Sequence, residues 1–168
     1  MKPRIPKITH KRLLELLDYN PEIGLFRWRQ QRSWRAPVGS VAGVVDRHGH
    51  RTMMVDQERF MAHRLAWFYV YQEWPPNEID HINGLRDDNR ILNLRLAVRW
   101  QQRGNQKRRA DNRSGFKGVK KAGKNSWIAR CRIHGKEYTK CGFRSPEDAH
   151  VAYLEMAKSI FGDYARAE

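Results

Sequence analysis

The segment Ile79–Arg95, with the sequence IDHINGLRDDNRILNLR, decides how the rest of the chain is interpreted. It follows a Pro-Pro break and places a carboxylate and an imidazole side by side, as Asp80 and His81. Gly84 then allows a turn, and Asn93 comes twelve residues after His81. An ordinary loop needs the glycine and the asparagines. It does not need the Asp-His pair, so we interpret that pair as a site of chemistry.

An isolated Asp-His pair is more often a structural hydrogen-bonded pair than a catalytic one. Here the spacing to Asn93, the turn at Gly84 and a strongly basic second half of the chain favour catalysis. Hydrolysis of a phosphodiester needs a base that activates water and a cation that neutralises charge on the phosphate. A histidine beside a carboxylate supplies both when a polar side chain opposes it from a packed helix. We expect that helix to begin near Ala97 and to lie across the strand of His81.

The stretch from His63 onward, HRLAWFYV…EWPPNEIDHINGLRDDNRILNLRLA, resembles the H-N-H homing endonucleases of phages. The resemblance spans about residues 10–107. It implies a ββα-metal (His-Me finger) nuclease domain over residues 1–107, with its core at about 76–106.

This resemblance assigns a role to each motif position. His81 resembles the general base, and Asp80 resembles a ligand of one divalent metal ion, Mg²⁺ or Mn²⁺. Asn93 resembles the residue that fixes the loop and orients the histidine. The family has His or Asn at the third motif position, where this chain has Gln102. Gln102 keeps an amide oxygen for the metal but places it one methylene further out, and Asn105 is an alternative ligand or a phosphate contact.

The remaining polar residues of this half are interpreted as structural. We expect His63 to make hydrogen bonds within its helix or to the active-site loop. Three neighbours of the Asp-His pair are interpreted as turn and cap residues, namely Asp87, Asp88 and Asn89. No metal-ligand spacing links the other histidines considered, which are His48, His50, His134 and His150.

The composition indicates a folded protein with a polyanionic partner. The chain has 168 residues, of which 40% are hydrophobic, and 33 Lys and Arg against 18 Asp and Glu give a net charge of +15. A charge of this size indicates nucleic acid or an anionic membrane surface. No apolar run is long enough to span a bilayer, and the N-terminal sequence has no secretory signal pattern. We therefore expect double-stranded DNA as partner, with no membrane and no small-molecule cofactor.

Local patterns predict the secondary structure of the first half. Thr9 is a helix N-cap for about residues 10–18, and LFRWR alternates like a strand. Two strands joined at residues 46–50 follow, with a second turn near 56–58. MAHRLAWFYVYQEW is expected to be a helix that ends before the Pro-Pro break. LAVRWQQRGNQKRR is expected to form a further helix.

A polar, basic segment then separates the chain into two parts. We place a linker at residues 108–113 and a second domain at 114–168. In that domain GFKGVKK, SWIARCRI and KEYTKCGF are three short strands, and Ser145 caps an amphipathic helix that Gly162 ends. Cys131 and Cys141 fall on neighbouring strands and are interpreted as reduced thiols, with a cross-strand disulfide as the alternative.

Strand alternation predicts a basic face on this second sheet. Trp127, Ala129, Cys131 and Ile133 are expected to point onto the helix, and Ile128, Arg130 and Arg132 to point the other way. The flanking strands are expected to add Lys117, Lys120 and Lys140 to this uncovered face. From residue 104 to residue 144 the chain has 13 Lys and Arg against 2 Asp and Glu. A solvated surface is the plainer explanation, but phosphate contacts explain so uneven a cluster better.

The order of these elements resembles the plant Apetala/ethylene-response-factor DNA-binding domain, in the form found in phage and bacterial nucleases. The resemblance covers about residues 112–166 and implies that the sheet lies in the major groove. The first strand here is rich in lysine and lacks the tryptophan of the plant proteins, which suggests weaker base readout and more backbone contact. The expected DNA-binding residues are Lys117, Lys120, Lys121, Lys124, Arg130, Arg132 and Lys140.

The sequence therefore predicts an α+β protein and a metal-dependent, site-directed DNA endonuclease. We expect a monomer that acts in the cytoplasm of an infected bacterial host. The alternative is a DNA-binding regulator whose nuclease site has decayed through Gln102. An RNA-binding protein would need stacking aromatics on the sheet face, where strand residues 126–133 offer only Ile128.

Overall fold

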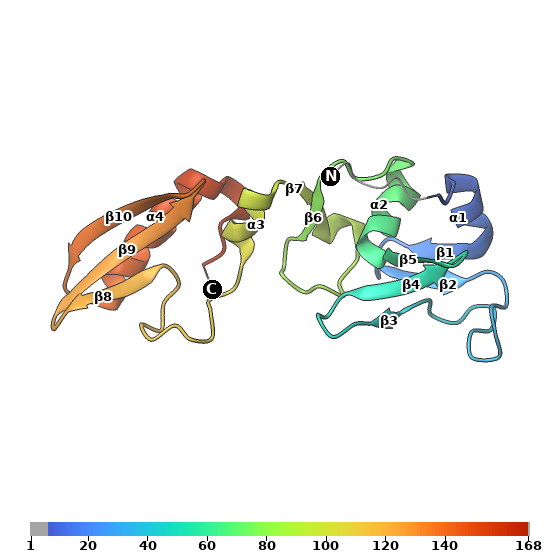
Figure 1. Cartoon of the computed structure of the whole chain (residues 1–168), viewed down its shortest axis with the longest axis horizontal. Coiled ribbons are helices and arrows are strands. Elements are labelled where there is room, and N and C mark those ends of the chain that lie inside the picture. Colours follow the sequence, from blue (N-terminus) through green and yellow to red (C-terminus); the bar gives the residue numbers. More distant parts are fainter. Residues whose placement is uncertain (1–6, 168) are drawn as a thin grey trace. The chain divides into compact units, whose positions relative to one another are not determined.

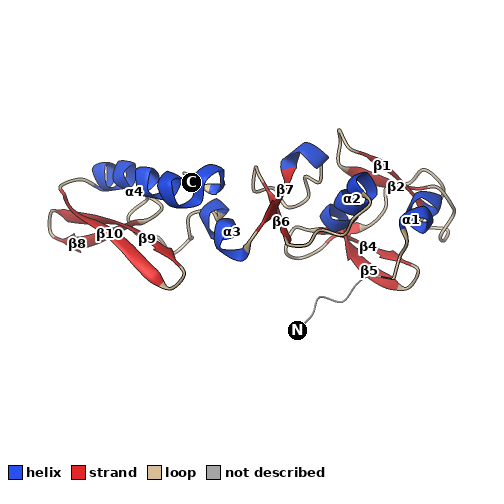
Figure 2. Ribbon diagram, turned by 90° about the horizontal axis from the view of Figure 1, so that it is seen from above, coloured by secondary structure: helices blue, strands red, loops and turns tan. Residues whose placement is uncertain are grey.

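The computed structural model describes residues 7–167, except for the side chains of residues 99, 102 and 103. The chain divides into two compact units, Met1–Leu96 and Ala97–Glu168. This division lies before the helix that the sequence assigned to the nuclease domain, and the functional boundary at residue 107 stays a prediction. Each unit combines helices with sheets (Figures 1 and 2), so the predicted α+β class is confirmed.

The first unit is built from small sheets and two helices. Its elements in chain order are α1 His10–Leu16, β1 Leu17–Asn20, β2 Leu25–Trp28, β3 Val44–Val45, β4 Arg51–Val55, β5 Glu58–Met61, α2 Ala62–Tyr71, β6 Glu78–His81, the 3₁₀ turn Ile91–Asn93 and β7 Leu94–Ala97. The strands form a β1-β2 hairpin, an antiparallel β3-β4-β5 sheet and a β6-β7 pair.

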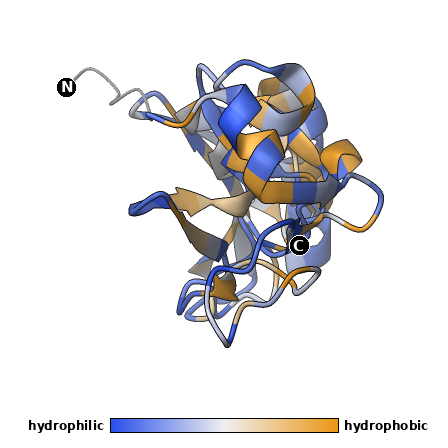
Figure 3. Ribbon diagram, turned by 90° about the vertical axis from the view of Figure 1, so that its right-hand side faces the viewer, coloured by the Kyte–Doolittle hydropathy of each residue, from blue (hydrophilic) through white to orange (hydrophobic). Residues whose placement is uncertain are grey.

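One core holds these elements together. α2 buries Leu65, Ala66 and Phe68, and α1 buries Leu13 and Leu16, in a single apolar cluster. Both helices therefore pack with an apolar face inward, and the helical ribbons of Figure 3 carry hydrophobic and hydrophilic residues side by side. The predicted Thr9 cap is confirmed, because its Oγ1 accepts from the Arg12 N–H at 3.2 Å.

Two expected helices are shorter than predicted because strands replace their ends. The first helix stops at Leu16, and Leu17 instead pairs with Trp28 in the β1-β2 hairpin. The helix expected from Leu96 starts only at Arg99, because Leu94–Ala97 is β7 and pairs with β6. In both cases backbone pairing prevails over local helix propensity.

The second unit is a three-stranded antiparallel sheet with a helix against it. Its elements are α3 Arg99–Asn105, β8 Val119–Gly123, β9 Ser126–Ile133, β10 Lys136–Phe143, α4 Pro146–Phe161 and the 3₁₀ turn Gly162–Tyr164. β9 is the central strand, and α4 contacts all three strands. The predicted three strands, the Ser145 cap and the helix end at Gly162 are confirmed.

A glycine makes close packing possible in this unit. Gly118, with φ +73°, stands against Tyr153 of α4, and a Cβ there would lie 2.0 Å from the tyrosine ring. Tyr153 is buried with Ala129 and Cys131 of β9 in the second core. Both cysteines are free thiols, and Cys131 is paired in register with Tyr138. Within residues 7–167, no helix has the length and apolarity that a membrane crossing requires.

Candidate active site

The strand β6 sends Asp80 and His81 to opposite sides. Ile79 and His81 are buried, at 7% and 5% exposure, and Asp80 between them is half-buried. Alternation along a strand therefore turns the imidazole toward the interior and the carboxylate the other way. Asp80 Oδ2 accepts hydrogen bonds from Arg95 Nε at 3.0 Å and Nη2 at 2.9 Å, and Arg95 lies on β7.

Asn93 ties together the loop that connects β6 to β7. Its Nδ2 donates to Asn83 Oδ1 at 3.0 Å and to the Asp88 carbonyl at 2.8 Å, and its Oδ1 accepts from the Asn83 N–H at 3.0 Å. The Ile82 N–H donates to the Asn93 carbonyl at 2.9 Å. The side chain and backbone of one residue thus fix both ends of the loop.

The Asp88 carboxylate makes charged hydrogen bonds within this loop. Its carboxylate accepts from the Arg90 guanidinium and, at 2.6 Å, from Asn83 Nδ2. The hydrogen bond from Arg90 is the main cause that lowers the pKa of Asp88 to about 2. Asp88 is therefore ionised wherever the protein is folded near neutral pH, and the sequence interpretation of it as a turn residue agrees with these contacts.

His81 has a buried hydrogen-bond partner that the sequence did not reveal. Its Nε2 lies 3.2 Å from Oδ1 of Asn89, and Asn89 is completely buried. Burial lowers the pKa of His81, and the hydrogen bond to Asn89 opposes that shift. A neutral imidazole at neutral pH is the form that can accept a proton.

Two further histidines surround His81. His63 of α2 lies edge-on to it with ring centroids 5.2 Å apart, and His50, just before β4, lies 5.9 Å from it. Burial lowers the pKa of His50 and lowers that of His63 to about 3. Within the described part of the chain, the buried Nδ1 atoms of His50 and His63 have no hydrogen-bond partner. Among residues 7–167, no three His, Cys, Asp or Glu side chains form a group that could hold a metal ion.

Two contacts hold the segment of His50 close to the loop that follows β6. Arg51 of β4 forms a pair of 2.9 Å hydrogen bonds with both carboxylate oxygens of Asp87. Arg86 Nη1 donates to the His48 carbonyl at 2.9 Å. These contacts join the start of β4 and the turn before it to the loop after β6, and so hold His50 near His81. No spacing in the sequence relates these three histidines, so their cluster could not be predicted from sequence patterns.

Residues 60–102 match the family model described as HNH endonuclease. The HNH match contains Asp80, His81, Asn89 and Asn93, the residues whose contacts define the site, and it supports nuclease activity on DNA. It also contains His63 but not His50. The comparisons with curated proteins and with solved structures gave no match.

The third predicted motif position of the HNH segment is not described at the side-chain level. Gln102 lies on α3, in the second unit, and its side chain is outside the described residues. Its role as a metal ligand therefore stays a prediction, as does the placement of α3 across β6. Asn105, the alternative, is buried at 8% exposure.

In the second unit, the uncovered face of the sheet is basic as predicted. Ala129 and Cys131 of β9 are buried against α4, whereas Arg130 and Arg132 are exposed. Lys120 is opposite Ile128 in the register and therefore shares the face of the two arginines. Trp127 does not follow the pattern fully, because it is half-buried and has Lys121 Nζ 5.6 Å from its ring centroid.

Two lysines of the predicted DNA-binding set lie elsewhere. Lys140 is opposite Ala129 and reaches Glu155 of α4 at 3.5 Å, so it lies on the helix side of the sheet, and the expectation that it joins the uncovered face is wrong. Lys117 lies before β8, and its ammonium donates to the carbonyls of Gly104 and Arg166 at 2.8 Å each. Burial lowers the pKa of Lys117 to about 8.

A basic cavity of about 780 Å³ adjoins β8. The segment at residues 106–114 forms one wall, and β8 with its neighbour β9 forms the other. Its charged and aromatic lining consists of Lys107, Arg108, Arg109, Asp111, Arg113, Lys117, Lys120, Lys121, Trp127 and Arg130. The predicted linker thus adds its cations to those of the sheet.

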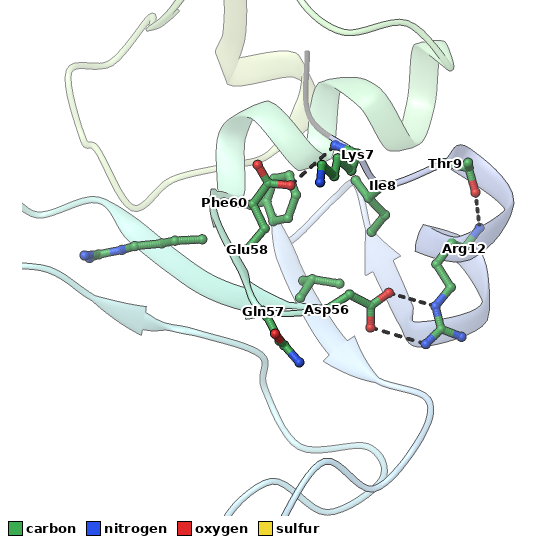
Figure 4. A pocket seen from close by; sticks show the side chains of 10 residues that line it. Lys7, Ile8, Thr9, Arg12, Asp56, Gln57, Glu58 and Phe60 are labelled. Atoms are coloured by element: carbon green, nitrogen blue, oxygen red, sulfur yellow. Dashed lines mark hydrogen bonds and ion pairs between the residues drawn. The ribbon is translucent and has the colours of Figure 1, made fainter. Parts of the chain in front are cut away.

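A second cavity, of about 660 Å³, belongs to the first unit but not to the HNH site. It lies between the start of the described chain and the β4–β5 turn, where Arg12 pairs with Asp56 and the Lys7 N–H donates to Glu58 (Figure 4). Neither Asp80 nor His81 lines it. Among the described residues, its charged groups are Lys7, Arg12, Asp56, Glu58 and Arg59, and no histidine stands beside a carboxylate there as it does on β6.

Proposed function

We propose that this protein is a metal-dependent, site-directed DNA endonuclease of the homing type. The observation that carries the proposal is the pair Asp80-His81 on β6, inside the segment that matches HNH endonucleases. The buried His81, the loop fixed by Asn93 and the large positive charge all suit phosphodiester hydrolysis.

His81 acts as the general base. Its burial keeps the imidazole neutral, and a neutral imidazole takes the proton from an attacking water. Asn93 contributes by holding the loop that follows His81, as its three side-chain hydrogen bonds support. Because the loop and β6 are fixed before DNA binds, little ordering remains to be done in the reaction.

Asp80 offers the kind of ligand that Mg²⁺ and Mn²⁺ prefer, a carboxylate oxygen. Asp80, with Gln102 as the predicted second protein ligand, would hold such an ion, and the ion would neutralise charge at the scissile phosphate. Among the described residues, the Asp80 carboxylate fits such an ion with one condition. Oδ2 of Asp80 already accepts from Arg95, so Arg95 competes with a cation for that oxygen.

The second unit binds the DNA. Lys120, Arg130 and Arg132 share the uncovered face of the sheet, and Lys121 and Lys124 are exposed beside it. A sheet can enter the major groove, where arginine reads guanine and lysine binds phosphate. We leave Lys117 and Lys140 out of this set, because their ammonium groups serve contacts within the unit.

Cleavage of supercoiled plasmid and of phage genomic DNA tests the proposal. The purified chain is incubated with Mg²⁺, with Mn²⁺ or with EDTA, and the ends of the products are mapped. We expect cutting with either metal, none with EDTA, and ends that cluster at particular sequences.

The alternative is a DNA-binding regulator without nuclease activity. The departure at Gln102 and the pairing of Asp80 with Arg95 favour it. Binding of duplex DNA without any metal-dependent nicking would select this alternative.

A further inference from the structure

Asn89 is buried more completely than its residue type predicts. Its exposure is 0%, although asparagine is mostly found at protein surfaces. Its side chain has two described contacts: Nδ2 donates to the Asp87 carbonyl at 3.0 Å, and Oδ1 lies 3.2 Å from His81 Nε2. A buried amide with both ends engaged is a fixed group that can orient a neighbour.

These two contacts determine which nitrogen of His81 carries the proton. The Asp87 carbonyl only accepts hydrogen bonds, so the NH₂ end of the Asn89 amide must face it. The amide oxygen then faces His81, and it also only accepts. Nε2 of His81 must therefore be the donor, and in the neutral ring the lone pair then belongs to Nδ1.

We infer that Asn89 is the positioning residue that sets the tautomer of His81, so that Nδ1 is the nitrogen that accepts the proton from water. This inference rests on the proposed function, because it refines the role of the base. In the step, an O–H bond of water breaks, its proton goes to Nδ1 and its oxygen bonds to phosphorus. The ester bond on the opposite side breaks, and the leaving oxygen takes a proton from solvent.

The β1-β2 hairpin packs against the backbone of Asn89. The Tyr19 hydroxyl donates to the Asn89 carbonyl at 2.6 Å, and both groups are buried. Gly24, with φ +73°, lies so close that a Cβ there would be 2.6 Å from the Asn89 carbonyl carbon. The β1-β2 hairpin therefore holds the residue that orients the base.

Asn89 and Asn93 divide the work that the sequence assigned to Asn93 alone. The described hydrogen bonds of the Asn93 side chain go to Asn83 and to the Asp88 carbonyl, which belong to the loop. Asn89 contacts the imidazole itself. Asn93 thus shapes the loop, whereas Asn89 selects the tautomer.

Nitrogen-15 NMR of the histidine rings tests this inference without DNA or metal. At about pH 8 the unperturbed imidazole is neutral, and the two tautomers differ in which nitrogen has the pyrrole-type shift. The His81 signals are assigned by their loss in His81→Gln. We expect a pyrrole-type Nε2 and a pyridine-type Nδ1, and the reverse pattern would overturn the inference.

Variants of Asn89 supply the second half of the test. Asn89→Leu removes the acceptor and should give mixed tautomers. Asn89→Asp loses the donor to the Asp87 carbonyl but keeps an acceptor opposite His81 Nε2, so it should keep the proton on Nε2. Asn125→Leu, on the exposed β8–β9 turn, is the matched control. An unchanged His81 spectrum in Asn89→Leu would contradict the inference. If Asn89→Leu does not fold, the spectra of the wild type and of Asn89→Asp still show whether Nε2 of His81 carries the proton.

Cleavage assays separate this inference from the proposed function. In single turnover at saturating DNA, we expect Asn89→Leu to slow cleavage about 10–100-fold with unchanged DNA affinity. Failure of the wild-type chain to cut DNA would refute the proposed function. The NMR spectra would then still test whether Asn89 sets the tautomer of His81. Cutting that requires His81 but shows a proton on Nδ1 would refute the inference alone.

Discussion

Arg95 of β7 and Asp80 of β6 form an ion pair across the two paired strands, with 3.0 and 2.9 Å between the guanidinium nitrogens and Oδ2 of Asp80. Both side chains are largely withdrawn from solvent, at 17% and 11% exposure. The pair therefore places a positive charge at the carboxylate that we propose as a metal ligand. Arg95 neutralises the Asp80 carboxylate, so a cation that binds there must share Asp80 with it.

Arg95→Gln should lower the Mg²⁺ concentration needed for half-maximal nicking, because the competing charge at Asp80 is gone. It should also destabilise the first unit by about 1–3 kcal/mol, since the ionised Asp80 carboxylate loses its two hydrogen bonds from the guanidinium. Titration of Mg²⁺ in a plasmid-nicking assay measures the first effect. Arg29→Gln, in an exposed pair with Asp18, is the control. An increased Mg²⁺ requirement would show that Arg95 assists metal binding.

Asn93→Ala should loosen the loop between β6 and β7. The change removes the hydrogen bonds that the Asn93 side chain makes with Asn83 and with the Asp88 carbonyl, so we expect a loss of about 2–4 kcal/mol in the free energy of unfolding. Hydrogen exchange at the Asn83 amide should accelerate in parallel. Leu92→Ala is a matched control, because Leu92 is 90% exposed and adjacent in sequence. Equal effects of the two changes would remove the loop-fixing role.

Acid should destabilise the first unit through its buried histidines. The pKa of His63 is lowered from 6.5 to about 3 in the folded state. Between these values the unfolded chain binds a proton that the folded chain does not, so stability rises with pH and is lost as pH falls. The slope is about 1.4 kcal/mol per pH unit for one proton.

Hydrogen exchange of the α2 amides at several pH values measures this dependence in the full chain. His63→Gln should reduce the slope between pH 4 and 6, and His48→Gln, at an exposed position, should not. A slope that is the same with and without His63 would show that other groups cause the acid sensitivity.

The two faces of the second sheet should respond differently to mutation. Lys120→Ala should reduce the slope of log affinity against log salt by about one unit, because one phosphate contact is lost. Lys140→Ala should leave the slope unchanged, since Lys140 lies on the α4 side with Glu155. Binding of duplex DNA at several salt concentrations gives both slopes. A slope reduced equally by both variants would contradict the assignment of faces.

Arginine on the same face should affect specificity. If Arg130 or Arg132 reaches a guanine edge, its replacement by Ala should cost about 1–3 kcal/mol at the preferred site and much less on random DNA. Equal losses on both DNAs would mean that the sheet only grips the backbone. Site choice would then fall to the basic loop of the first unit, where Trp34 is 79% exposed with the Arg35 guanidinium 4.5 Å from its ring centroid.

Local signals predicted the second unit well and the first unit in part. The two faces of β9 follow from alternation, and the Ser145 cap from residue type, because both are properties of one element. The face on which Lys140 lies depends on the register of β10 against β9, in which Lys140 is opposite Ala129, and no local signal in the sequence gives that register. β1 and β7 were missed because each depends on a partner strand rather than on its own propensity.

The candidate site shows the same limit. Asp80, His81 and Asn93 stand out in sequence because their spacing resembles a known motif. Asn89 reads as a turn residue, because nothing in the sequence shows that the β1-β2 hairpin will bury it against His81. His50 and His63 meet His81 only through the contacts between the β3–β4 turn, α2 and β6.

The rate of single-turnover DNA cleavage by His81→Ala tests the central claim most directly. With Mg²⁺ and saturating DNA, we expect cleavage about 10²–10⁴-fold slower than wild type, with DNA affinity and folding nearly unchanged. His48→Ala, a nearby exposed histidine, should cut at the wild-type rate. Cleavage by His81→Ala at the full wild-type rate would contradict the assignment of His81 as the base, and with it the HNH mechanism proposed for this chain.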